Sequence, residues 1–258
     1  MIQARIIPLL LFSKEGLWKG VGFRNHTYVG DALNAIRIFN SREADELFFI
    51  DIDARAEGRA IRPELVAHIA KECFMPLSVG GGIASVKDAQ EALNAGAEKV
   101  IVNSQAVRNP ALVGELAGKF GSQCVVVALD IQRQTDGRAE LYIDNGKTPT
   151  GRDPATLALE MAKAGAGEIL ITSIERDGTG QGYDLDLLSR ISAQLSIHVL
   201  AGGGAGKLEH LAQAVQQGGA RAAVAGSLFV FQGRRRAVLI NFPSRTERER
   251  LLSISPEI

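Results

Sequence analysis

The two halves of this chain carry the same motifs in the same order. In the first half, residues 77–83 (LSVGGGI) end in a glycine turn and residues 99–104 (KVIVNS) follow. In the second half, residues 198–206 (HVLAGGGAG) are followed by residues 222–227 (AAVAGS). Each half therefore has an apolar run with a glycine turn, a helix-like segment, and a second apolar run ending in a small hydroxyl residue. Such a chain should fold into an architecture with two similar halves.

The segments that open the two halves also correspond, with one difference. Residues 6–11 (IIPLLL) match residues 125–130 (VVVALD), so Leu11 stands where the second half has Asp130. A site built for two carboxylates would have one here.

Short apolar runs alternate with amphipathic segments, and the runs are typical of buried parallel strands. We expect strands at residues 5–11, 46–52, 76–79, 99–102, 124–130, 168–172, 197–200 and 221–225. Apolar residues spaced by three and four between them indicate helices that lie on a sheet. Eight such units in two similar halves favour a (β/α)8 barrel over a doubly wound sheet. We expect a single domain over 1–258, with half-barrels of about 1–120 and 121–232 and a C-terminal extension at 233–258.

Two segments fall outside the eight units. Residues 132–149 are expected to form a small hairpin or loop after the fifth strand. The extension is expected to pack as a last helix or to carry an oligomer contact, with the cluster Arg234, Arg235 and Arg236 in solvent.

Composition excludes several classes of function. The chain has 29 Lys and Arg against 29 Asp and Glu, so no overall field attracts nucleic acid or an acidic membrane. Cys73 and Cys124 are too few for a disulfide framework and lack zinc-ligand spacing. Neither a signal-peptide pattern nor a membrane-length apolar run is present, so we expect a soluble protein of the reducing cytoplasm.

Chemistry in such barrels takes place at the carboxyl ends of the strands. Glycine turns there expose backbone N–H groups which, with a hydroxyl, can hold a phosphate, although tight turns need glycine in any case. Both halves have such a set, which suggests a ligand with two phosphates. The candidate phosphate-binding residues are Gly81, Gly82, Ser104, Gly203, Gly204, Gly226 and Ser227.

Asp130 is the candidate general acid or base, because apolar surroundings would raise its pKa toward neutrality. A capping role is the alternative. Asp177 could contact the substrate or shape a mobile loop. Lys19, in the loop after the first strand, could close over an anion or lie in solvent. The four histidines share no metal-ligand spacing, and neither a metal nor a cofactor is expected.

The opposite ends of the strands carry alternating charges. Arg5, Glu46, Lys99 and Glu168 stand at the first positions of the first, second, fourth and sixth strands. If these side chains point inward, they form a ring of two cations and two anions that closes the barrel bottom. Buried charges persist only when paired, so each cation should contact the anions. The alternative is that each points to solvent.

Several ordered motifs resemble one known family, the cyclase subunit of imidazole glycerol phosphate synthase. The resemblance covers residues 1 to about 232 and rests on the motifs RIIP (5–8), VGGGI (79–83), GSQ (121–123), VVVALD (125–130), GAGEIL (165–170), TSIERDGT (172–179) and GGAG (203–206).

That resemblance implies a (β/α)8 barrel that binds a bis-phosphorylated ribonucleotide, with a glutaminase subunit docked at the barrel bottom. Ammonia would pass up the barrel through a charged gate. Arg5, Glu46, Lys99 and Glu168 match the residues that form this gate in the family. Asp130 matches one catalytic aspartate of the family, and Leu11 falls at the other. Asn103, Thr172 and Asp177 match further active-site positions, and Lys19 matches the lysine of the mobile first loop.

Leucine cannot transfer a proton, so the family's own reaction is in question. Residues 39–47, 51–54, 226–231 and 236–243 are similar to paralogues associated with bacterial surface polysaccharides. The resemblance implies that ammonia goes to a third protein, which turns a sugar acetamido group into an acetamidino group. Two alternatives stay open: a working cyclase of histidine biosynthesis, and a conduit or assembly subunit without catalysis.

Overall fold

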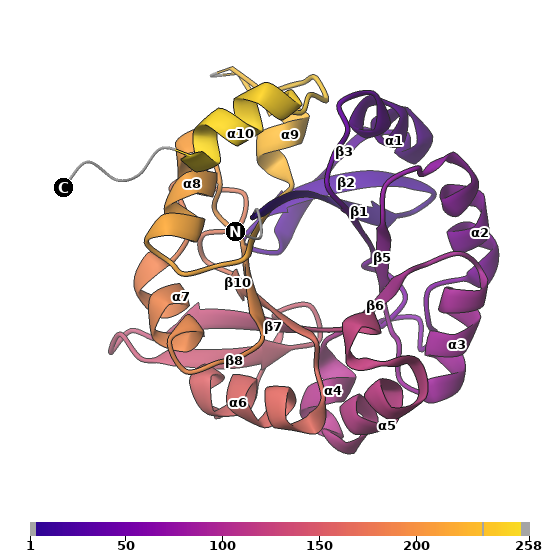
Figure 1. Ribbon diagram of the computed structural model, residues 1–258, viewed down its shortest axis with the longest axis vertical. Helices are drawn as coiled ribbons and strands as arrows, with labels where there is room; N and C mark the ends of the chain where they lie inside the picture. Colours follow the sequence, from indigo (N-terminus) through magenta and orange to yellow (C-terminus); the bar gives the residue numbers. More distant parts are fainter. Residues whose placement is uncertain (1–3, 234, 254–258) are drawn as a thin grey trace.

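The computed structural model describes residues 4–233 and 235–253, and these form a (β/α)8 barrel (Figure 1). Within the described residues, eight parallel strands close the barrel because β12 pairs with β1 and β7 pairs with β10. In order around the barrel they are β1 (Arg5–Ser13), β4 (Leu47–Asp51), β5 (Leu77–Gly80), β6 (Lys99–Val102), β7 (Val125–Arg133), β10 (Glu168–Ser173), β11 (His198–Gly202) and β12 (Ala222–Ala225). The predicted fold class and all eight predicted strands are confirmed.

Helices surround the barrel and cover the outer face of the strands (Figure 1). They are α1 (Ala32–Ser41), α2 (Pro63–Glu72), α3 (Val86–Asn94), α4 (Ser104–Arg108), α5 (Ala111–Phe120), α6 (Pro154–Ala164), α7 (Leu185–Ser192), α8 (Leu208–Gln216) and α9 (Ser227–Val230), with a short 3-10 turn η1 (Ser122–Cys124). Local chemistry sets several starts: the carboxylates of Asp31, Asp153 and Asp184 each accept a backbone N–H bond in the first turn.

Alternate residues of each strand point into the barrel, and this period of two stacks the interior in layers. The described residues of the middle layer form one apolar cluster, separate from the larger core between strands and helices. Its buried members are Ile7, Phe48, Ile101, Val126, Ala128, Leu170, Leu200, Ala222 and Val224. Charged side chains lie below this layer and a pocket lies above it.

The charged layer closes the barrel bottom. Arg5 forms ion pairs with both Glu46 and Glu168. Lys99 Nζ lies 3.0 Å from Glu46 and 2.9 Å from Glu168, so each charge contacts both opposite charges. Ser78 adds a hydrogen bond to Glu46 at 2.6 Å. Burial acts to raise the pKa of Glu168, but the charges of Arg5 and Lys99 hold this pKa below its usual value. We call these four residues the charged ring.

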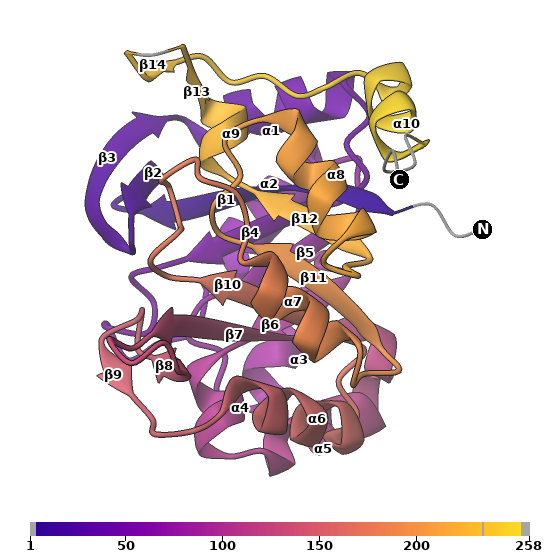
Figure 2. The ribbon, with the colours of Figure 1, turned by 90° about the vertical axis from the view of Figure 1, so that its left-hand side faces the viewer.

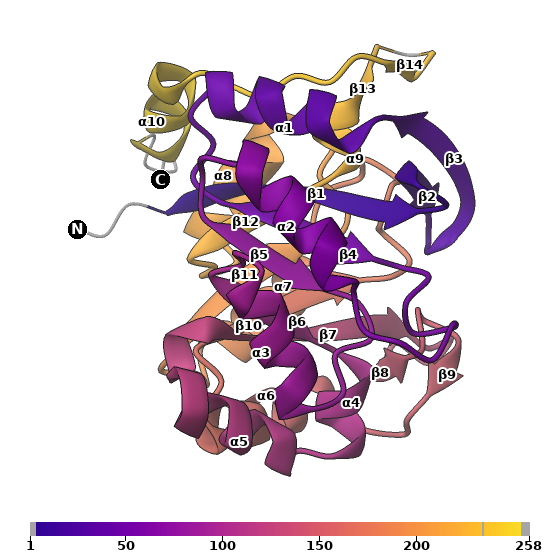
Figure 3. The same ribbon diagram turned by 90° about the vertical axis from the view of Figure 1, so that its right-hand side faces the viewer.

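Hairpins rise from the opposite end, at the barrel mouth (Figures 2 and 3). The predicted insertion at 132–149 is confirmed as an antiparallel extension of β7 with β8 (Ala139–Ile143) and β9 (Thr148–Pro149). A second hairpin, β2 (Gly16–Val21) and β3 (Arg24–Gly30), continues β1. The sequence did not indicate it, because β3 is mostly exposed and lacks apolar alternation. Lys19, expected in a loop, therefore lies in a strand.

A short hairpin, β13 (Phe231–Gln232) with β14 (Ala237–Val238), leads into the C-terminal extension, which contains the helix α10 (Arg245–Ser253). The expected last helix is therefore present. Of the arginine cluster, Arg234 lies outside the described residues, whereas Arg235 and Arg236 are exposed and Arg236 donates to the carbonyl of Gly178. Within the described ranges, no helix is long and apolar enough to cross a membrane.

One buried arginine fixes α10 to the barrel. Arg248 is 5% exposed and donates to the carbonyls of Arg42, Glu43 and Pro243 at 2.6–2.9 Å. Its guanidinium also lies 5.2 Å from the ring centre of Phe242, which is fully buried.

Arg248→Ala should lower the free energy of unfolding by roughly 2–3 kcal/mol, because it leaves three carbonyls without their charged donor. Urea unfolding followed by circular dichroism measures this change. The control is Arg250→Ala, which alters an exposed arginine of the same helix. Equal stability of the two variants would show that Arg248 does not anchor α10.

Candidate functional site

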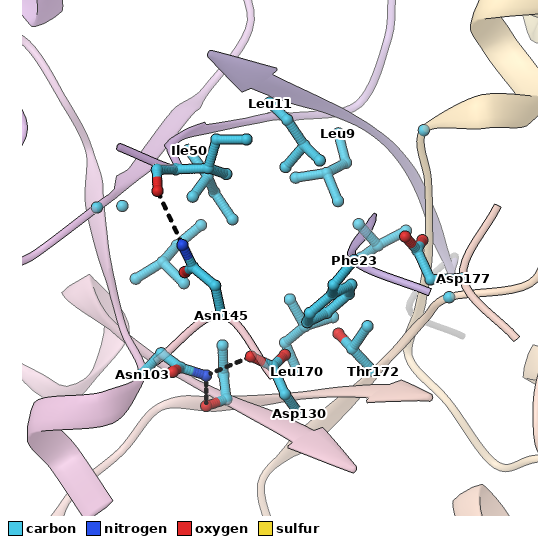
Figure 4. A pocket seen from close by; sticks show the side chains of 18 of the residues that line it. Leu9, Leu11, Phe23, Ile50, Asn103, Asp130, Asn145, Leu170, Thr172 and Asp177 are labelled. Atoms are coloured by element: carbon cyan, nitrogen blue, oxygen red, sulfur yellow. Dashed lines mark hydrogen bonds between the residues drawn. The ribbon is translucent and has the colours of Figure 1, made fainter. Parts of the chain in front are cut away.

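A pocket opens at the carboxyl ends of the barrel strands, above the apolar layer (Figure 4). Every strand-end residue that the sequence singled out lines it: Asn103, Ser104, Asp130, Thr172, Asp177, Gly81, Gly82, Gly203, Gly204, Gly226 and Ser227. Lys19 reaches it from the β2–β3 hairpin. The charged ring lies at the other end of the barrel and contributes nothing to this pocket.

Asp130 is the central acid of the pocket. The side-chain amide of Asn103 donates to Asp130 Oδ2 at 3.0 Å and to the carbonyl of Ala128 at 2.9 Å, which fixes the amide beside the carboxyl (Figure 4). Burial raises the pKa of Asp130 to about 7; the Asn103 bond opposes this shift and the charge of Asp177 adds to it. A carboxyl group with this pKa can both accept and release a proton near neutral pH.

Leu11 faces Asp130 from the other side of the pocket (Figure 4). The strand order places β1 and β7 four positions apart in a barrel of eight, so these strands lie opposite each other among the described residues. Leu9 and Ile50 line the pocket beside Leu11. The side chains of this wall are hydrocarbon, and they can neither transfer a proton nor hold an ion.

Lys19 and Asp177 form the charged side of the pocket. Lys19 is 5% exposed, and its ammonium donates to the carbonyl of Leu9 at 2.6 Å. Burial lowers the pKa of Lys19 to about 8, against the opposing charge of Asp177. Burial also raises the pKa of Asp177, and Lys19 limits that shift. Gly226 leaves room for the ammonium, because a Cβ there would lie 2.1 Å from Lys19 Nζ.

Thr172 lies between these groups and Asp130. It pairs in register with Asp130 on β7 and with Gly202 on β11. Figure 4 shows its side chain beside those of Asp130 and Asp177.

The two glycine turns have backbones that exclude side chains. A Cβ on Gly82 would lie 1.9 Å from the carbonyl oxygen of Arg59, and one on Gly204 would lie 2.2 Å from that of Gly182. Both residues have positive φ, 63° and 117°. The fold therefore requires glycine at both positions with or without a ligand. Ser104 Oγ donates to Asn103 Oδ1 at 2.9 Å and accepts the N–H of Asp144 at 3.0 Å.

Sequence reasoning missed several pocket residues that lie outside the barrel strands. Phe23 sits at the β2–β3 turn with a positive φ of 61° and reaches over the pocket beside Asp130 and Thr172 (Figure 4). Asn145, in the β8–β9 turn, donates to the carbonyl of Ile52 at 2.9 Å. His26 and Arg55 also line the pocket. Gly20, near the end of β2, and Gly22, in the turn itself, were the sequence signal for the first hairpin.

Asp130→Asn should change stability in a pH-dependent way. The folded-state pKa of about 7 lies above the ordinary value of 3.8, so stability from the protonated carboxyl is present at low pH and lost as pH rises toward 7. The variant keeps an acceptor for Asn103 and has no such loss. Urea unfolding should show little difference at pH 4, and above pH 7 a variant more stable by on the order of 2 kcal/mol. A difference that stays constant from pH 4 to pH 8 would contradict the shifted pKa.

Comparison with known proteins agrees with the motifs and the geometry. Residues 5–235 match the family described as "Histidine biosynthesis protein". A putative imidazole glycerol phosphate synthase subunit HisF from Leptospira interrogans is 45% identical over 97% of this chain and 99% of its own length. HisF from Alkaliphilus metalliredigens is 45% identical over 89% of this chain and 91% of its own, and a putative hisF3 subunit from Vibrio vulnificus is 42% identical over 98% of both. The chain belongs to the histidine biosynthesis protein family, on the branch of the HisF barrel subunits of imidazole glycerol phosphate synthase.

Proposed function

We propose that this chain is the barrel subunit of a glutamine amidotransferase complex, which takes ammonia from a glutaminase partner at the barrel bottom. The observation that carries the proposal is that the charged ring and the pocket lie at the two ends of one apolar barrel interior. The relatives are named as subunits of a synthase, which accords with a partner chain.

The interior suits ammonia better than ammonium. Leaving water is costly for a cation and cheap for a small neutral molecule, so the apolar layer of Ile7, Phe48 and Leu170 favours NH3. The charged ring stands below that layer as the gate. Its four mutual ion pairs must separate for a molecule to pass, and contact with a docked partner could supply the energy.

The pocket receives an anionic small molecule. Lys19 supplies a buried positive charge beside Gly226, and the two glycine turns with Ser104 and Ser227 are the proposed phosphate sites. Asp130, with its pKa near 7, is the proton-transfer group, and Asn103 orients it. Thr172 and Asp177 would bind the ligand between the two phosphate sites.

Leu11 bears on which reaction uses the ammonia. Ring closure with lyase cleavage needs proton transfer on two sides of the substrate, and the side chain of Leu11, which faces Asp130, has no group for it. This favours delivery of ammonia to a third protein that converts a sugar acetamido group to an acetamidino group in surface polysaccharide synthesis. Residues 226–231 and 236–243, which resemble the paralogues of such systems, support that assignment.

The second candidate is the cyclase and lyase reaction of histidine biosynthesis. It is favoured by Asp130, Asn103, Thr172 and Asp177, which all line one pocket. A third candidate, a conduit without catalysis, needs the charged ring but not Asp130. Loss of activity in Asp130→Asn with the complex intact would exclude the conduit.

The chain alone should not hydrolyse glutamine. Burial raises the pKa of Cys73 to about 11, and its thiol donates to the carbonyl of Met75 at 3.3 Å, so it is a poor nucleophile. Cys124 closes a 3-10 turn at the start of β7. Glutamate release by the purified chain should equal that of a Cys73→Ser, Cys124→Ser variant. Turnover that both substitutions abolish would contradict the need for a partner.

The chain should carry out imidazole-forming cyclisation poorly, even with saturating ammonium that bypasses any partner. General acid or base catalysis is typically worth about 10²- to 10⁴-fold, so a missing group should lower the rate by that order. Absorbance or chromatography of the bis-phosphorylated ribonucleotide measures the turnover. Leu11→Asp should raise it, whereas Leu11→Asn, which has the size but cannot act as a general acid or base near neutral pH, should not. An ordinary enzymatic rate in the unaltered chain would establish the cyclase instead.

A further inference from the structure

The pocket has a second cation besides Lys19. Arg55, in the segment between β4 and α2, lines the pocket, and its side chain is 40% exposed. Within the described ranges, its one side-chain hydrogen bond runs from Nε to Asp144 Oδ1 at 3.1 Å. The two terminal amino groups of the guanidinium therefore remain available, and these are the donors that bind an oxyanion in bidentate fashion.

Asp144 does not depend on Arg55 for a counter-ion. Arg108, from α4, donates to both carboxylate oxygens of Asp144, and Thr148 donates to Oδ2 at 3.2 Å. The bond from Arg108 is the largest cause that holds the pKa of Asp144 at about 2. Two cations thus share one anion, and the cluster of Arg55, Arg108 and Asp144 has a net positive charge. Partly exposed ion pairs of this kind are weak, so the Arg55 contact can exchange for another anion.

The cluster flanks one of the two glycine turns. The backbone N–H of Asp144 donates to Ser104 Oγ, and the carbonyl carbon of Ala54, bonded to Arg55, lies 3.3 Å from the Cβ position of Gly82. Lys19 lies at the second candidate phosphate set, beside Gly226. The pocket accordingly has one cation at each end: Lys19 is buried and fixed, and Arg55 is held by an exchangeable partner.

We propose that Arg55 is a ligand-binding residue that recognises a phosphate-like oxyanion at the Gly82 and Ser104 end of the pocket, and that Asp144 is the counter-ion it leaves when the ligand binds. The inference rests on the proposed function, because it assumes an anionic ligand in this pocket. It adds a specificity element: ligands whose group at this end is neutral forgo the Arg55 contact.

A purely structural role predicts something different. Arg55 also joins the β4–α2 segment to the β8–β9 turn through its bond to Asp144. If this link only holds the two segments together, loss of either residue should have the same effect on ligand binding. A binding role predicts opposite effects. Loss of Arg55 removes a donor, whereas Asp144→Asn frees the guanidinium and removes a repelling charge.

The test uses inorganic phosphate as the probe and the full chain as the protein. Dissociation constants come from ³¹P NMR titration at pH 8, and phosphate-soaked crystals identify the occupied end. Arg55→Gln should weaken binding at the Gly82 and Ser104 end about tenfold, as expected for the loss of a charge-assisted contact. Asp144→Asn should tighten binding there. Arg62→Gln is the matched control, because Arg62 lies in the same segment, is 43% exposed and pairs with Glu15 outside the pocket lining.

The second phosphate end serves as an internal control, since Arg55→Gln should leave the occupancy beside Gly204 and Ser227 unchanged. Equal affinities of Arg55→Gln and Arg62→Gln would overturn the assignment of Arg55 and leave the proposed pocket intact. Weaker binding in Asp144→Asn, as in Arg55→Gln, would show a structural link and overturn the counter-ion role. Failure of the unaltered chain to bind phosphate at either end would overturn the phosphate sites and this inference with them.

Discussion

The two-residue alternation of the barrel strands is the constraint on which this structure depends. Along β1, Arg5, Ile7, Leu9 and Leu11 lie on one face, and they meet the ring, the apolar layer and the pocket in turn. A shift of one residue in the pairing of β1 with β12 would exchange this face with the face that packs on the helices. Closure of the barrel therefore fixes the chemistry at both ends at once.

The barrel and the inward-facing residues were predictable because both depend on local periodicity. Buried parallel strands are short apolar runs, and the residues at or just beyond their ends fall at one rim, which is how Asp130, Asn103 and Thr172 were found. The contacts at the mouth were not predictable in this way. Phe23, Asn145 and Arg55 lie on exposed turns, where no hydrophobic pattern constrains the backbone and tertiary contacts decide the path.

A net charge of zero conceals strong local organisation. At the mouth, the Lys19 ammonium and the Asp130 carboxyl share one pocket. Burial disfavours the charged form of both groups, so the pKa of Lys19 is lowered and that of Asp130 is raised. The same pocket has a wall of leucine and isoleucine on one side. The carboxyl of Asp130 therefore lies on the β7 side of the site, whereas the hydrocarbon of Leu9 and Leu11 lies on the β1 side, next to the Lys19 ammonium.

The ion pairs at the barrel bottom also bear on how such a chain can diverge. Arg5, Glu46, Lys99 and Glu168 form a closed neutral circuit, so replacing any one of them with a neutral residue leaves an unbalanced charge in a confined space. Removing one cation and one anion together restores neutrality. Substitutions in the charged ring should therefore occur in pairs, one cation with one anion. The uncharged side chains around Leu11 can be replaced one at a time. The pocket can therefore acquire new chemistry by single substitutions, whereas the charged ring changes only when two of its residues change together.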